Sequence, residues 1–167
     1  MEGIHLPHAG VSTIFGLLEM LDDLGGEEDI YEIGRSLNYE LDDLLPVLEA
    51  ADALGFVALA EGDIKMTPLG KELVDQDVDG RKELLRGRLL MHAVFMTIVG
   101  ELNASADRHI SRGFLIEMFE SRYSPEESER QLQTVIDWGR YAELIGYNPE
   151  TEEMYLDISH GPEEDSN

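Results

Sequence analysis

The pattern that most constrains the fold is a unit that occurs twice in this chain, a helical stretch followed by a short two-stranded ribbon. The later copy spans Ser124–Asp157 and the earlier copy spans Leu41–Thr67. In each copy, apolar residues recur at helical spacing, a glycine interrupts them, and two β-prone runs then flank a turn. Two copies are too few for a solenoid. The pattern therefore predicts two related modules.

A shift of 91 residues (132 minus 41) aligns the two copies and tests how closely they agree. The shift pairs Leu41 with Leu132, Leu44 with Val135, Leu45 with Ile136, Ala51 with Ala142, Leu54 with Ile145 and Gly55 with Gly146. This alignment predicts that the second helix ends at Gly146. It also places Leu48 opposite Gly139, and we expect the neighbouring Trp138 to fill the space that the glycine leaves.

The first module is predicted to contain three helices and a hairpin. Helical spacing of apolar residues covers Val11–Leu24, Ile30–Leu37 and Leu41–Leu54, and strands are predicted over Phe56–Ala60 and Ile64–Thr67. Asp29 is a suitable N-cap for the second helix, because its carboxylate can accept from backbone N–H groups of the first turn. Three helices followed by a hairpin is the winged-helix order.

The segment Asp79–Leu102 is predicted to form one long helix. Its apolar residues lie nearly all round the helix axis, and such a helix must be buried on most sides. It is either the spine between the two modules or part of an interface between two copies of the chain. A homodimer is therefore one of the two expectations for this segment.

The second module begins with Ser111, which can cap a helix through Phe119. Ser124, Pro125 and Glu127 then form a capping box with proline at the first helical position. The predicted fold is mainly α with small β-hairpins: tandem winged-helix modules joined by the long helix. We expect a first module over 9–78, the long helix and second module over 79–158, and loose termini over 1–8 and 159–167.

Composition excludes several classes of protein. The 167 residues contain no cysteine, which excludes disulfide frameworks and thiolate metal sites. The N-terminus lacks the features of a signal peptide, and no apolar run is long enough to span a bilayer. We therefore expect a soluble, cytoplasmic protein without membrane insertion.

Charge argues against nucleic acid as a direct partner. Thirty-six acidic residues against twelve basic ones give a net charge of −24, and a field of that sign repels phosphate backbones. The helices that winged-helix proteins place on DNA are themselves acidic here. The first carries four acidic residues and no Lys or Arg between Asn38 and Gly55: Asp42, Asp43, Glu49 and Asp52.

No motif in the chain indicates catalysis, and we expect no enzyme activity and no cofactor. The nearest fragment to a phosphate-binding loop, Leu69–Glu72, lacks the upstream glycine spacing and the hydroxyl residue. The five histidines have no metal-site partners at a suitable spacing, so we expect no metal. His92 lies among apolar residues and is expected to be a hydrogen-bonded core histidine. Adjacent acidic pairs such as Asp22-Asp23 indicate solvated faces.

Two groups of residues are candidates for docking a partner. The concentrated positive charge consists of Arg81, Lys82, Arg86 and Arg88; the aromatic group consists of Trp138, Arg140 and Tyr141. The basic residues either pair with nearby carboxylates at the start of the long helix or bind an acidic partner. The aromatic group either packs in the core or forms a contact surface, because Trp, Tyr and Arg dominate interface hot spots.

With these residues described, the chain resembles the AAA-associated C-terminal domain family, which follows the ATPase of nitrate/sulfonate/taurine-type ABC transporters. The stretches that carry the resemblance lie within residues 6–157 and are LEMLDDLGGEEDIYEIG, LDDLLPVLEAADALGF, EGDIKMTPLGKEL and RQLQTVIDWGRYAELIGY. The resemblance implies a regulatory accessory module that acts with an ABC-type ATPase or permease.

This chain departs from the family pattern in beginning at Met1 without an ATPase domain. We therefore expect the ATPase subunit or permease on a separate chain, and association with the membrane only through that partner. The alternative is a winged-helix transcription regulator that binds DNA or an effector and uses one module for dimerisation.

Overall fold

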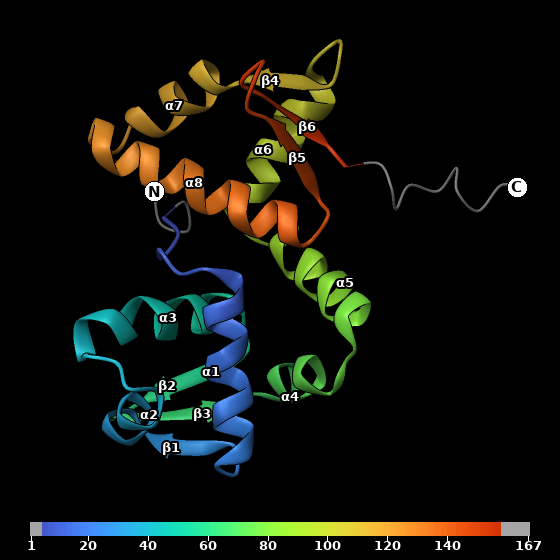
Figure 1. The fold of residues 1–167 in the computed structure, drawn as a ribbon. Coiled ribbons are helices and arrows are strands. Elements are labelled where there is room, and N and C mark those ends of the chain that lie inside the picture. Colours follow the sequence, from blue (N-terminus) through green and yellow to red (C-terminus); the bar gives the residue numbers. More distant parts are fainter. Residues whose placement is uncertain (1–4, 158–167) are drawn as a thin grey trace, which may run out of the picture. The chain divides into compact units, whose positions relative to one another are not determined.

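The computed structural model describes residues 5–157, which divide into two compact units (Figure 1). The first unit is Pro7–Arg88, and the second unit consists of the described residues from Leu89 onward together with His5 and Leu6. Both units combine helices with one small antiparallel sheet. The predicted fold class, mainly α with small β-hairpins, is confirmed in that form.

The first unit contains five helices and a three-stranded sheet among its described residues. In chain order these are α1 (Val11–Asp23), β1 (Glu27–Asp29), α2 (Ile30–Leu37), α3 (Leu41–Ala53), β2 (Val57–Ala60), β3 (Asp63–Met66), α4 (Pro68–Asp75) and α5 (Val78–Leu89). The strands are ordered β1-β3-β2, so β3 is central. Helix α1 packs against α3 and α4 (Figure 1).

The second unit repeats the order of the first six elements of the first unit: helix, strand, helix, helix, strand, strand. Its elements are α6 (Ala93–Ala104), β4 (His109–Ser111), α7 (Arg112–Glu120), α8 (Pro125–Tyr141), β5 (Ile145–Asn148) and β6 (Glu153–Leu156). The strand order is β4-β6-β5. Helix α7 packs against α8, and α6 lies against β4 and β6 (Figure 1).

The predicted helix caps are present. The Asp29 carboxylate accepts from the backbone N–H of Tyr31 at 2.8 Å. The Ser124 hydroxyl accepts from the N–H of Glu127 at 3.1 Å, and the Ser111 hydroxyl accepts from that of Phe114 at the same distance. Each contact satisfies a donor of the first helical turn that has no partner inside the helix. Local sequence therefore decides where these helices begin.

The single long helix predicted over Asp79–Leu102 is wrong. The segment forms two helices, α5 and α6, and the chain turns between Leu89 and Ala93. His92 adopts an extended backbone and caps α6, with its Nδ1 accepting from the N–H of Val94 at 3.3 Å. The residues at this break are acceptable in helices, so local propensity alone does not show it.

The alignment of the two copies also needs correction, because α8 ends at Tyr141 and not at Gly146. The helix C-caps are Leu54 and Ala142, which gives a shift of 88 residues (142 minus 54). The residue after each cap has positive φ, 85° at Gly55 and 56° at Glu143. The two alignments differ by three residues, and positions three apart share a helix face. Apolar residues therefore match in either alignment.

Two short strands escaped prediction. β1 and β4 are three residues each, and each pairs with the returning strand of its ribbon: Glu28 with Ile64, and Ile110 with Met154. Three residues are too few to show the period-two pattern of a strand. Each predicted two-stranded ribbon is therefore a three-stranded sheet.

Part of the predicted loose N-terminus is ordered. Leu6 is fully buried, and its backbone N–H and C=O both bond to the side-chain amide of Gln131 at 2.9 Å. Gln131 is itself buried on α8. The predicted loose tail 159–167 lies outside the described residues.

Candidate functional site

Arg81, one of the predicted docking residues, is held inside the first unit. Its guanidinium donates to the carbonyl oxygens of Leu73 at 3.2 Å and Val74 at 3.0 Å, which belong to the last turn of α4. It also pairs with Glu19 at 2.9 Å and lies 5.7 Å from the ring centroid of Phe15. A cation at the C-terminal end of a helix complements the unbonded carbonyls there.

Arg88 has a similar role at the end of α3. Its Nε donates to the carbonyl oxygen of Leu54 at 2.9 Å. Its guanidinium lies so close to Gly55 that a Cβ there would be 2.8 Å from Nη2. The other two residues of the predicted basic group, Lys82 and Arg86, are half-buried. Two of the four cations therefore bind helix ends within the first unit.

The aromatic group of predicted docking residues is also divided by burial. Trp138 is fully buried, Tyr141 is half-buried, and Arg140 is exposed. A side chain with no exposed surface is part of a core, which favours the packing interpretation for Trp138. The sequence placed these residues on one helix, but burial decides that they do not form one exposed surface.

The outer face of α3 is acidic in the structure as well as in the sequence. Its four acidic residues are all exposed: Asp42, Asp43, Glu49 and Asp52. Leu41 and Leu45 on the same helix are 41% and 42% exposed, which gives this face an apolar component. Negative charge on this face opposes contact with a phosphate backbone.

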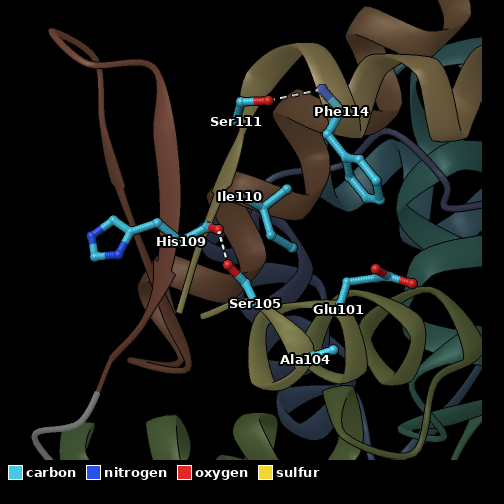
Figure 2. Close-up of a pocket in the computed structure, with 7 residues that line it drawn as sticks. All are labelled: Glu101, Ala104, Ser105, His109, Ile110, Ser111 and Phe114. Atoms are coloured by element: carbon cyan, nitrogen blue, oxygen red, sulfur yellow. Dashed lines mark hydrogen bonds between the residues drawn. The ribbon is translucent and has the colours of Figure 1, made fainter. Parts of the chain in front are cut away.

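A cleft of about 290 Å³ lies in the second unit, where the end of α6, strand β4 and the start of α7 meet (Figure 2). Its lining residues are Glu101, Ala104, Ser105, His109, Ile110, Ser111 and Phe114. Ile110 is 6% exposed and forms an apolar surface of the cleft, while the Phe114 ring is 44% exposed. Figure 2 shows Glu101 and Phe114 on the same side of Ile110, with the His109 ring pointing away.

Hydrogen bonds order the loop beside this cleft. The Ser105 hydroxyl donates to the Asp107 carboxylate and to the carbonyl oxygen of His109, both at 2.9 Å. Asp107 also accepts from the N–H of His109 at 3.1 Å. These bonds, first that from Ser105, lower the pKa of Asp107 and keep it negatively charged. The cleft therefore has a hydrogen-bonded, negatively charged carboxylate beside it.

The lining of the cleft contains one carboxylate, from Glu101, and two hydroxyls that already take part in hydrogen bonds. It also contains His109, whose ring points away from Ile110 (Figure 2). Sequence reasoning identified neither Glu101 nor Phe114 as a site residue. Spacing alone does not separate Phe114 from the buried face of α7, because Phe114 and Met118 are four residues apart as the buried Leu115 and Phe119 are.

His92 forms a hydrogen bond at the start of α6, but it is half-buried and not in the core as predicted. Burial lowers the pKa of His92 below its usual value of 6.5. Its Nδ1 acts as an acceptor at the helix N-terminus, and that role requires the neutral ring. The role of His92 is therefore to cap the N-terminus of α6.

A known protein family matches most of this chain. The family model of the C-terminal AAA-associated domain matches residues 31–148. The chain belongs to this family. No curated protein and no solved structure matches the chain.

The C-terminal AAA-associated domain match begins within α2 and ends at the last residue of β5. It therefore includes segments of both units, the break between α5 and α6, and every residue that lines the cleft. No helix among residues 5–157 is long and apolar enough to cross a membrane.

Proposed function

We propose that this C-terminal AAA-associated domain protein is a non-catalytic regulatory module that binds the ATPase or permease of an ABC transporter of the nitrate/sulfonate/taurine type. Family membership supports an accessory role. The proposal places the protein in the cytoplasm, at the membrane only through its partner. Its two units are proposed to be winged-helix modules, because each has the order helix, strand, helix, helix, strand, strand.

The observation that carries this proposal is the acidic outer face of α3. In winged-helix proteins that bind DNA, the third helix enters the major groove. Here that helix presents Asp42, Asp43, Glu49 and Asp52 to solvent. Phosphate neutralisation supplies most non-specific DNA affinity, and carboxylates oppose it. The module is thus better suited to a basic protein surface, where complementary charge speeds association.

The test measures direct binding of this protein to a purified ABC-type ATPase of the proposed class. Isothermal titration calorimetry at two salt concentrations gives the affinity. We expect saturable binding that weakens as salt rises, and a change in the ATPase rate at saturation. Asp42→Asn with Asp43→Asn should slow association, because steering charge is lost. The proposal would be excluded if saturating amounts of this protein produced neither a heat of binding nor a change in the ATPase rate.

The alternative is a winged-helix transcription regulator, and the order of elements in each unit favours it. A gel-shift titration at low salt separates the two functions. Sequence-selective retardation of a DNA fragment, lost on competition with the specific unlabelled fragment only, would establish the alternative. We expect no retardation, because low salt strengthens the repulsion between DNA and the acidic face.

A further inference from the structure

The end of α6 has an unbalanced charge. Helix α6 has no basic residue in its last turn, while the exposed Glu101 lies there. The carbonyl end of a helix carries a partial negative charge, so a carboxylate there is unfavourable and a cation is favourable. None of the ion pairs among residues 5–157 involves Glu101. This end of the helix is therefore complementary to a cation that the described part of the chain does not supply.

The aromatic wall of the cleft matches the same kind of ligand. Phe114 exposes 44% of its surface beside the buried Ile110. A guanidinium is planar, weakly hydrated and stacks on aromatic faces, which an ammonium does less well. Its several donors can also reach a carboxylate while the plane covers a ring. Figure 2 shows the Glu101 carboxylate and the Phe114 ring facing the same space.

Size and charge narrow the class of ligand. A volume of about 290 Å³ is just below the range of small-molecule sites, which span roughly 300–1,000 Å³. Anionic ligands are opposed by Glu101, by Asp107 nearby and by the net charge of −24. The same net charge opposes a second copy of this chain as the occupant. A single basic side chain of a protein partner fits both the volume of the cleft and the negative charge around it.

We propose that the cleft formed by α6, β4 and α7 binds an arginine side chain of the partner protein. Glu101 accepts from the guanidinium, Phe114 covers its plane, and Ile110 contacts its aliphatic stem. The α6 C-terminus adds a favourable field. The identity of the partner rests on the proposed function. The binding of an arginine side chain to the cleft can be tested without the partner protein.

The first experiment uses N-acetyl-arginine amide as the probe, with amide shifts of ¹⁵N-labelled protein as the readout. N-acetyl-citrulline amide has nearly the same shape without the charge, and N-acetyl-lysine amide has the charge without the planar fork. We expect saturable shifts at Ser105, Ile110 and Phe114 with the arginine probe, and binding at least roughly threefold weaker with the lysine probe. The citrulline probe should cause no saturable shifts at these residues.

Matched variants separate specific binding from general attraction to an acidic protein. Glu101→Gln should weaken the arginine probe roughly tenfold, because it removes a charged hydrogen-bond acceptor. Glu117→Gln changes the net charge equally on an exposed residue of α7 that does not line the cleft, and should leave affinity unchanged. Phe114→Leu should weaken binding about threefold.

Stability gives an independent readout on Glu101. Because a carboxylate at the end of α6 is unfavourable, Glu101→Gln should keep or raise the melting temperature while it weakens binding. A variant that lost both would instead show a structural role for Glu101. Shifts spread evenly over exposed carboxylates, equal binding of citrulline or of lysine, or unchanged affinity in Glu101→Gln would overturn the arginine site.

Whether the ATPase is the partner that uses the cleft is tested separately. With the purified ATPase, Glu101→Gln should weaken binding and Glu117→Gln should not. If the arginine probe binds the cleft but the ATPase does not bind the protein at all, the proposed function fails and the arginine site stands. If the ATPase binds both variants as tightly as the original protein, the cleft is excluded as its docking point.

Discussion

At the scale of single residues, Gly139 shows how one absent side chain sets the packing of the second unit. It lies on α8, where an added Cβ would collide with the side chain of Ile145 and come within 3.4 Å of Phe95. The sequence suggested that Trp138 fills this space, but Ile145 of β5 does so. The glycine allows the first strand of the ribbon to approach the helix closely.

The first prediction concerns this contact. Gly139→Ala should destabilise the protein by about 1–3 kcal/mol, because a buried isoleucine must shift to make room. Gly100→Ala is the matched control, since Gly100 is an exposed residue of α6 and a Cβ there meets nothing within 4 Å. The control should stabilise by about 0.5–1 kcal/mol through helix propensity. Urea unfolding of the two variants measures both, and equal effects would refute the packing argument.

His92 illustrates a residue whose protonation state is tied to a helix start. Burial lowers its pKa, so the folded protein binds a proton less readily than the unfolded chain. Stability from this group is complete above pH 6.5, the usual pKa. It is lost as the pH falls from there toward the lowered pKa of the folded state.

The second prediction follows from that sign. Between about pH 7.5 and about pH 5.5, the free energy of unfolding should fall more steeply for the original protein than for His92→Asn. Asparagine keeps an N-cap acceptor but does not titrate in this range. His92→Ala should cost about 1 kcal/mol at neutral pH. Parallel pH profiles for the original protein and His92→Asn would show that His92 does not contribute.

At the scale of elements, helix ends in the first unit are completed by arginines from elsewhere in the chain. Arg88 on α5 bonds to the end of α3, and Arg81 bonds to the end of α4. The local sequence predicted the helix starts, because caps act within a few residues. These helix ends depend on residues that are distant along the chain or on another helix, so local patterns could not predict them.

The third prediction tests one such end. Arg88→Met keeps an aliphatic stem and removes the guanidinium, and it should destabilise the first unit by about 1.5–3 kcal/mol. Arg35→Met is the control, because Arg35 is an exposed residue whose guanidinium pairs with Glu32 at 3.0 Å. Exposed pairs contribute about 0–1 kcal/mol. Thermal and urea unfolding compare the variants, and a loss no larger than that of the control would contradict the role of Arg88.

The two sheets show where element prediction stops. The hairpin β2–β3 is connected by Glu61 and Gly62, both with positive φ (54° and 86°), which is the turn that suits a two-residue hairpin. β1 and β4 have no such local signal, because each exists only through pairing with a strand far along the chain.

At the scale of the whole molecule, net charge is the dominant property. With a net charge of −24 on 167 residues, the acidic side chains repel one another. This repulsion is stronger in the folded state than in the expanded chain. This repulsion is a cost of folding that dissolved ions reduce. The same charge steers basic partners toward the protein and anionic ones away.

The fourth prediction is that added salt stabilises this protein. Between about 0.1 M and about 1 M KCl the screening length falls from about 10 Å to about 3 Å, so self-repulsion is largely removed. The melting temperature should rise by several degrees over that range. Potassium sulfate at equal ionic strength separates screening from ion-specific effects. A melting temperature that falls or stays constant in KCl would contradict the repulsion argument.

The sequence by itself determined the class of the fold, the order of most elements and most of the helix starts, since periodicity and capping act over a few residues. It also determined the charge that argues against DNA. Only the tertiary structure decided that α5 and α6 are separate, that α8 ends at Tyr141, and that Arg81, Arg88 and Trp138 lie inward. It alone brought Glu101 and Phe114 into one cleft. Those outcomes depend on which distant surfaces meet, and a local pattern carries no information on that.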